Sequence, residues 1–142
     1  MSYLEKRAWI YAIVALVVPV AYVATLLVRA PAAGLATSHY VVPLLVAVGV
    51  AIVLNIAAGT VAASGASGAS REARAGDERD RAIGRLGEYA GYYVVSIGAV
   101  VPLVLAMREA PYFWIANSLY LAIALSALVS SVVKIIAYRR GL

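Results

Sequence analysis

Cysteine is absent from this 142-residue sequence, and histidine occurs once, as His39. Without cysteine the chain has no disulfide bonds, thiolate nucleophiles, cysteine-ligated metals or iron–sulfur clusters. One histidine argues against a histidine-built metal or haem site, and no H-E-x-x-H motif or glycine-rich phosphate loop is present. His39 also lacks a catalytic partner, and its place beside Tyr40 is typical of an interfacial aromatic residue. We therefore expect no enzyme activity, no metal and no cofactor.

Charged residues are also scarce, at 13% of the chain, whereas 64% of the residues are hydrophobic. Soluble domains contain about 45–50% apolar residues, so this surplus excludes an ordinary soluble globule. The composition predicts an all-α integral membrane protein embedded in the lipid bilayer. The formal net charge is +5, but the basic residues lie beside apolar runs. This placement indicates membrane orientation and gives no reason to expect direct binding of nucleic acid.

Long apolar runs are abundant, and each is long enough to cross a bilayer. The predicted spans lie at about residues 8–28, 39–62, 89–107 and 112–138, within a single membrane domain covering residues 1–142. The short connection at 108–111 requires the third and fourth spans to be antiparallel neighbours. We therefore expect two antiparallel hairpins. A secretory signal peptide is the alternative for the first span, although its apolar region is normally only about 7–15 residues long.

Basic residues are distributed unequally between the two sides of these spans. Ten lie on the side of the termini and the central loop, and only Arg29 and Arg108 lie on the other side. Cytoplasmic segments retain lysine and arginine, so both termini and the loop at about 64–88 are expected to be cytoplasmic. The sequence thus predicts a multi-pass protein of the cell (plasma) membrane.

The central loop changes character along its length. Residues 64–70 are a Ser/Gly/Ala repeat typical of flexible coil, and Asp77 is a suitable N-cap for a helix that continues into the third span. Five acidic and five basic residues between positions 71 and 88 cancel in charge. The segment is either a solvated extension of the span or a docking surface for a cytoplasmic protein or an anionic lipid headgroup. Mixed charge favours the protein, with Asp77, Arg81 and Arg85 as candidate contacts.

Small residues follow one side of the third helix and of the fourth. Such stripes let membrane helices approach closely, although a substrate path along the same seam is the alternative. Because the glycines exceed the needs of one hairpin, we also expect a homo-oligomer. Asn55 and Asn117 are expected to make interhelical hydrogen bonds rather than ligand contacts. The predicted packing residues are Asn55, Gly84, Gly87, Gly91, Asn117, Ser126 and Ser130.

Glu88 and Lys134 lie at the cytoplasmic ends of the third and fourth spans. Counting residues outward from the connection at 108–111 places them at similar depth on neighbouring helices. The spacing predicts an ion pair that is partly removed from water. Alternatively, Lys134 extends to the headgroups by itself.

The charged run at 77–83, the Ala116-Asn117 pair and the sequence at 138–141 resemble a family of uncharacterised four-span integral membrane proteins of bacteria and archaea. The resemblance covers mainly the chain from Asp77 onward. Members are often encoded beside small helix-turn-helix regulators, which implies a membrane component of a regulatory pair. Our leading hypothesis is a non-enzymatic membrane regulatory or partner-binding protein that acts through its charged cytoplasmic segment. The alternative is a small oligomeric transporter or channel, although the spans carry no ionisable group at mid-depth.

Overall fold

A computed structural model describes residues 3–29, 34–37, 39–64 and 72–140. All regular structure in these residues is helical, and four segments are long and apolar enough to cross a membrane, which confirms the predicted all-α class. These segments are Arg7–Val28, Val41–Thr60, Glu78–Met107 and Tyr112–Arg140. The helices are α1 (Tyr3–Val28), the 3-10 turn η1 (Leu35–Thr37), α2 (Val41–Ser64), α3 (Glu72–Gly98), α4 (Val100–Met107) and α5 (Tyr112–Arg140).

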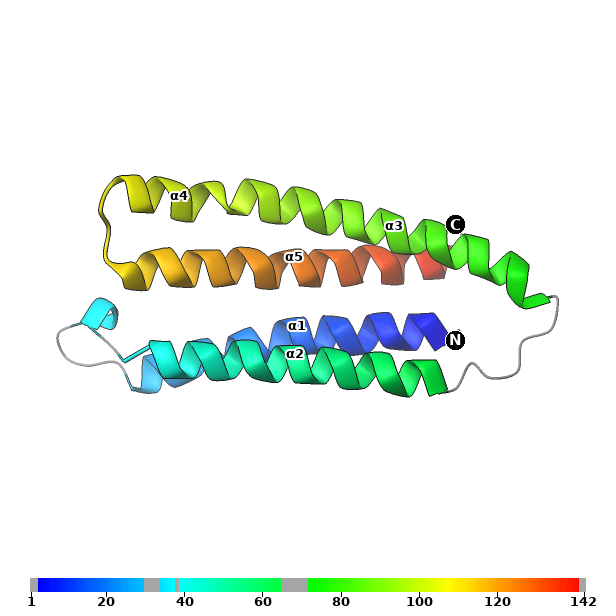
Figure 1. The fold of residues 1–142 in the computed structure, drawn as a ribbon, viewed down its shortest axis with the longest axis horizontal. Helices are drawn as coiled ribbons and strands as arrows, with labels where there is room; N and C mark the ends of the chain where they lie inside the picture. Colours follow the sequence, from blue (N-terminus) through cyan, green and yellow to red (C-terminus); the bar gives the residue numbers. More distant parts are fainter. Residues whose placement is uncertain (1–2, 30–33, 38, 65–71, 141–142) are drawn as a thin grey trace.

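The long helices lie side by side along one axis (Figure 1). Helix α5 packs against α1, α3 and α4, whereas α2 packs mainly against α1. The start of α1, the end of α2, the start of α3 and the end of α5 lie at one end of the molecule. The end of α1, the start of α2 and the turn from α4 to α5 lie at the other end. The four long segments therefore alternate in direction along the chain.

The third apolar segment differs from its prediction in two respects. Helix α3 begins at Glu72, so Asp77 lies inside the helix and is not its N-cap. The reason is that Glu72 and the alanines and arginine after it are strong helix formers, which outweigh the single Gly76. The second difference is a break at Ala99, where the sequence predicted a continuous span.

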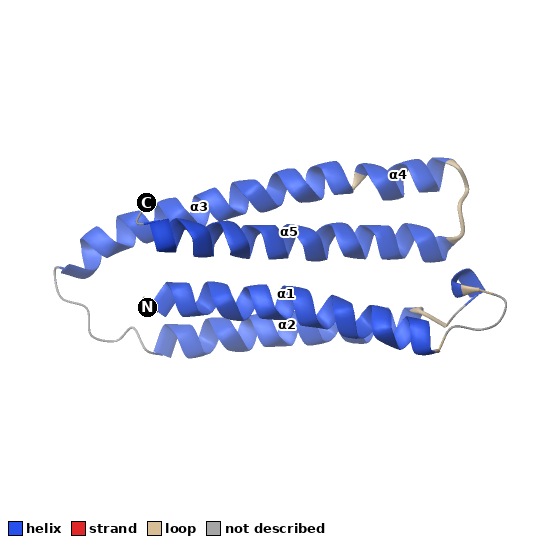
Figure 2. Ribbon diagram, turned by 180° about the vertical axis from the view of Figure 1, so that it is seen from behind, coloured by secondary structure: helices blue, strands red, loops and turns tan. Residues whose placement is uncertain are grey.

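Pro102 explains this break. Proline has no amide hydrogen, so the carbonyl four residues earlier, at Gly98, loses its helical partner. Hydrogen bonds from the Ala99 amide to Val95 O, at 2.8 Å, and from the Leu103 amide to Ala99 O, at 3.3 Å, still carry helical pairing across the break. In Figure 2 the break is the short tan segment between α3 and α4, and the two helices keep nearly one direction.

The connection between α4 and α5 is a tight helix ending. The Glu109 amide donates to Ala106 O and the Ala110 amide to Leu105 O, both at 3.0 Å. This pair of bonds is the Schellman arrangement, in which the residue after the cap adopts a left-handed conformation. Here that residue is Glu109, with φ of 52°. A short closed turn of this kind brings α4 and α5 together as antiparallel neighbours.

Two small apolar clusters hold the helices together. Val18, Tyr22 and Leu26 of α1 meet Ala47 of α2 and Phe113 of α5 in the first cluster. The second cluster joins Ala8 and Ala12 of α1 to Ile135 of α5. Most large apolar side chains of the described residues point outward instead, and many are more than half exposed. Soluble monomers rarely expose apolar patches of this size.

Candidate functional site

The charged start of α3 is held in place by close packing against α5. Gly87 lies directly against Lys134 and Ser130. The approach is so close that a Cβ atom added to Gly87 would be only 2.8 Å from the Ser130 carbonyl oxygen. One turn later, Ser126 donates a hydrogen bond of 2.7 Å from its Oγ to the carbonyl oxygen of Gly91. Small side chains thus let the two backbones approach within hydrogen-bonding distance. The structure brings together the glycine stripe of α3 and the serine stripe of α5.

The same seam extends in both directions along α3. Gly98 meets Ala122, with 2.7 Å between a Cβ built on Gly98 and the Ala122 Cβ. Towards the start of α3, Ile83 is buried, and Asp80 lies beside Tyr138 of α5. One face of α3 is therefore committed to α5 over several helical turns.

This packing alters the predicted role of the glycines. Gly87 and Gly91 contact α5 of the same chain, so they provide no surplus surface for self-association. Gly84 differs from its prediction as a packing residue, since a Cβ built there would meet no atom within 4 Å. Gly84 lies one turn before Gly87 and close to the same side of the helix, but it is partly exposed and α5 does not approach it closely there. Gly87 and Gly91 therefore give no support to a homo-oligomer, which stays a prediction.

Glu88 and Lys134 approach each other across the seam. The Lys134 Nζ lies 3.9 Å from Glu88 Oε1, which is the outer limit of an ion pair. The Lys134 side chain is only 24% exposed because its stem lies against Gly87, whereas the Glu88 side chain is 74% exposed. The lysine side chain is thus mostly covered and the carboxylate is open, so the pair is shielded on one side only. Such a contact contributes about 0–1 kcal/mol to stability.

The face of α3 opposite the seam carries the candidate binding residues. Arg81 and Arg85 are both exposed, and the side chain of Asp77 lies outside the described part of the structure. A shallow cavity of about 480 Å³ is lined by Arg85, Glu88, Tyr89 and Tyr92. It offers a cation, a carboxylate and two phenol rings within about two helical turns, and of these arginine and tyrosine are enriched at protein interfaces.

No family model, no curated protein and no solved structure matches this chain. Its function is therefore argued from the arrangement of its own residues. The resemblance proposed from the charged run at 77–83 remains a hypothesis on that basis.

A second polar contact lies deep between α1 and α5, at the predicted residue Asn117. The Tyr22 hydroxyl donates to Asn117 Oδ1 at 2.6 Å, and Asn117 Nδ2 donates to the Phe113 carbonyl at 2.8 Å. The ring of Tyr120 stands edge-on to Tyr22, with 5.3 Å between ring centroids. Sequence reasoning missed Tyr22. Its position in the middle of an apolar run, away from the aromatic belts at the ends, was the available signal.

Two other polar residues have local roles. Asn55 was expected to bond a neighbouring helix, but it is exposed and donates from Nδ2 to Ala51 O of its own helix, at 2.7 Å. Helix α2 packs mainly against α1, and Asn55 lies on an exposed side of it, so its amide bonds within its own helix. His39 is exposed and lies just before α2. Within residues 3–29, 34–37, 39–64 and 72–140, no three His, Asp or Glu side chains are grouped as a metal site requires.

Proposed function

We propose that this chain is a multi-pass protein of the plasma membrane, with two antiparallel helical hairpins in the bilayer and both termini in the cytoplasm. The outward-facing apolar side chains of the long helices support insertion, because lipid satisfies a surface that water does not. The unequal ends support the orientation. Lys134, Arg139 and the arginines of α3 lie at the end that holds both termini, whereas Arg29 and Arg108 lie at the other.

Aromatic rings at the basic end support the same orientation. The guanidinium of Arg7 lies 5.0 Å from the Tyr11 ring centroid and donates from Nε to the Tyr11 hydroxyl at 2.7 Å. The Arg139 guanidinium lies 5.6 Å from the Trp9 ring centroid. Paired basic and aromatic side chains are typical of the boundary between lipid and cytoplasm.

Within this membrane protein, the exposed face of α3 serves as the binding surface for a cytoplasmic regulatory protein. The observation that carries this proposal is that one face of α3 packs against α5 while the opposite face is exposed. Gly87 and Gly91 attach one face of the helix to α5, and the opposite face presents Arg81, Arg85 and the tyrosines. A rigidly held helix with arginine and tyrosine on its exposed side suits protein recognition, because little conformational entropy is lost on binding.

Pull-down from native membranes tests this function. We expect the double variant Arg81→Glu, Arg85→Glu to lose a partner that the original chain captures, because reversed charge places like charges at the contact. Arg108→Glu is the matched control, since Arg108 is an exposed arginine at the opposite end. The same partner captured equally by the double variant and the control would contradict the proposal.

Cysteine labelling tests the orientation, and the cysteine-free sequence provides a clean background. Single cysteines replace Ala36, Ser70, Glu109 and Leu142. A membrane-impermeant reagent should label positions 36 and 109 in intact cells, and positions 70 and 142 only after the membrane is opened. Labelling of position 70 from outside would show that the threading is wrong.

A further inference from the structure

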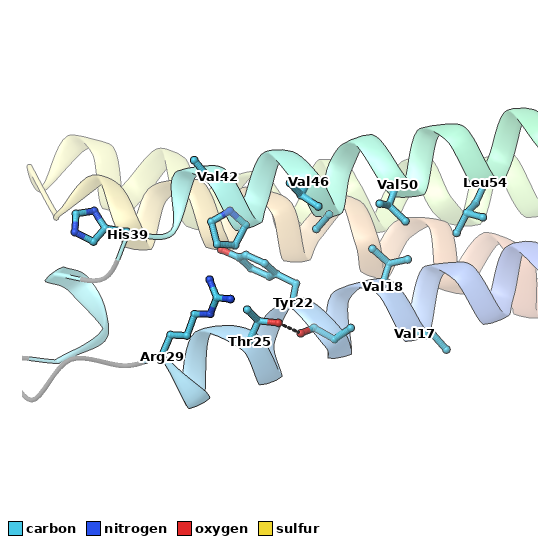
Figure 3. A pocket seen from close by; sticks show the side chains of 13 residues that line it. Val17, Val18, Tyr22, Thr25, Arg29, His39, Val42, Val46, Val50 and Leu54 are labelled. Carbon is cyan, nitrogen blue, oxygen red and sulfur yellow. Dashed lines mark hydrogen bonds between the residues drawn. The ribbon is translucent and has the colours of Figure 1, made fainter.

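A groove of about 690 Å³ runs along the surface between α1 and α2, and it is separate from the α3 surface described above. Valine is the commonest residue of its walls, with Val17 and Val18 on α1 and Val46 and Val50 on α2. Figure 3 shows these side chains on both sides of the groove, with Leu54 at one end. The groove is thus long and apolar along most of its course.

The opposite end of the groove is polar. Arg29 and His39 line it there, and both residues are exposed. In Figure 3 the Arg29 side chain rises from the end of α1 towards α2, between Tyr22 and His39. The Thr25 hydroxyl, one turn below, donates to Ala21 O at 2.8 Å. The positive charge of Arg29 therefore lies at the polar end of an otherwise apolar groove.

No carboxylate of the described residues lies within 4 Å of the Arg29 guanidinium, and residues 30–33 and 38 contain no acid. Glu109 is the one acidic residue in the connections at this end of the molecule, and no ion pair joins it to Arg29. Every other acid lies at or beyond Glu88 towards the opposite end, or at Glu5. The charge of Arg29 is therefore not neutralised by the groove's own surroundings.

The length of the groove matches one leaflet of a bilayer. Twelve residues separate Val17 from Arg29, which corresponds to about 18 Å along α1 at about 1.5 Å per residue. One leaflet contributes about 15 Å, half of the hydrocarbon thickness of about 30 Å. A lipid tail that starts beside Arg29 would therefore end near the middle of the membrane, at the level of Val17 and Leu54.

We propose that this groove binds an anionic phospholipid, with its phosphate at Arg29 and His39 and one acyl chain along the valine walls. The inference shares the membrane insertion proposed above, but it does not depend on the partner surface of α3. Charge complementarity selects the anionic lipid, because a guanidinium binds phosphate through directed hydrogen bonds and an anionic headgroup adds no competing positive charge.

Lipid retention on the purified chain tests the proposal. Detergent-solubilised protein is incubated with equal amounts of phosphatidylglycerol and phosphatidylcholine, passed through gel filtration, and its retained lipids are measured by mass spectrometry. We expect phosphatidylglycerol to exceed phosphatidylcholine about fivefold, the preference that one basic residue near a lipid surface provides. Arg29→Gln should bring this ratio close to one. Arg108→Gln, at the same end of the molecule but outside the groove, should keep it.

A second variant tests the apolar part of the groove. Val46 is exposed within the groove, so Val46→Trp fills the groove without disturbing the buried clusters. We expect this variant to retain much less of either lipid. Unchanged retention in Val46→Trp, or an equal loss of preference in Arg29→Gln and Arg108→Gln, would overturn the proposal. So would a halved molecular mass in Val46→Trp, which would assign the groove to a second copy of the chain. Arg85→Glu should retain lipid normally, which separates this test from that of the partner surface.

Discussion

Replacement of Gly87 by alanine provides a quantitative test of the contact between α3 and α5. The added Cβ would lie 2.8 Å from the Ser130 carbonyl oxygen and 2.5 Å from Cγ and Cε of Lys134. Ordinary contacts between carbon and a carbonyl oxygen are about 3.3–3.6 Å. The helices would therefore have to separate by about 0.5 Å or more at this point. Overpacking of this kind costs about 1–3 kcal/mol.

Gly84→Ala is the matched control, because Gly84 lies one turn earlier in the same helix and its Cβ position is open. Alanine is preferred to glycine in a helix by up to about 1 kcal/mol. Both variants gain this propensity, so it cancels in their difference. We expect Gly84→Ala to be more stable than Gly87→Ala by about 1–3 kcal/mol in free energy of unfolding.

Thermal unfolding in detergent, followed by the helical circular dichroism signal, measures this difference. The double variant Gly87→Ala, Lys134→Ala adds a further distinction. It removes the lysine stem but leaves the Ser130 carbonyl, so only part of the loss should be recovered relative to Lys134→Ala alone. Equal stability of Gly84→Ala and Gly87→Ala would refute the proximity of these two backbones.

Three further predictions concern single contacts. Glu109→Gly should raise the free energy of unfolding by about 1 kcal/mol, because glycine adopts the left-handed conformation at lower cost; an unchanged melting temperature would contradict this. Tyr22→Phe should lower the free energy of unfolding by about 0.6–1.7 kcal/mol, since Asn117 Oδ1 loses its donor. An unchanged melting temperature would show that this hydrogen bond does not stabilise the protein. A double-mutant cycle of Glu88→Gln and Lys134→Met should give a coupling below about 1 kcal/mol; a larger coupling would show a pair shielded from water.

The sequence predicted the long helices well, because an apolar run of about 20 residues leaves few alternatives to a helix. Helix α2 begins at Val41 and ends at Ser64, each two residues from the predicted bounds of 39 and 62. Helix α1 ends at Val28, the predicted residue. The start of α3 was predicted less well, since the choice between Glu72 and Asp77 depends on small differences in propensity.

Rotation about each helix axis was predicted only where small residues mark a face. The stripe of Gly87 and Gly91 does meet Ser126 and Ser130. Asn55 shows the opposite case, because apolar residues surround α2 on every side and no pattern defines which side meets a neighbour. The hydrogen bond between Tyr22 and Asn117, which are 95 positions apart, also depends on the tertiary arrangement, and a local sequence pattern does not encode that arrangement.

The central position of α5 has a consequence for how the molecule is assembled during synthesis. Helices α1, α3 and α4 all pack against α5, yet α5 is translated after every one of them. Until it emerges from the ribosome, Tyr22 has no Asn117 to bond, and the glycines of α3 have no opposing backbone. Helices α1 and α2 can pack against each other before α5 exists, whereas α3 and α4 gain their neighbour only once α5 is made. The contacts that join the two halves of the chain are therefore the last that can form.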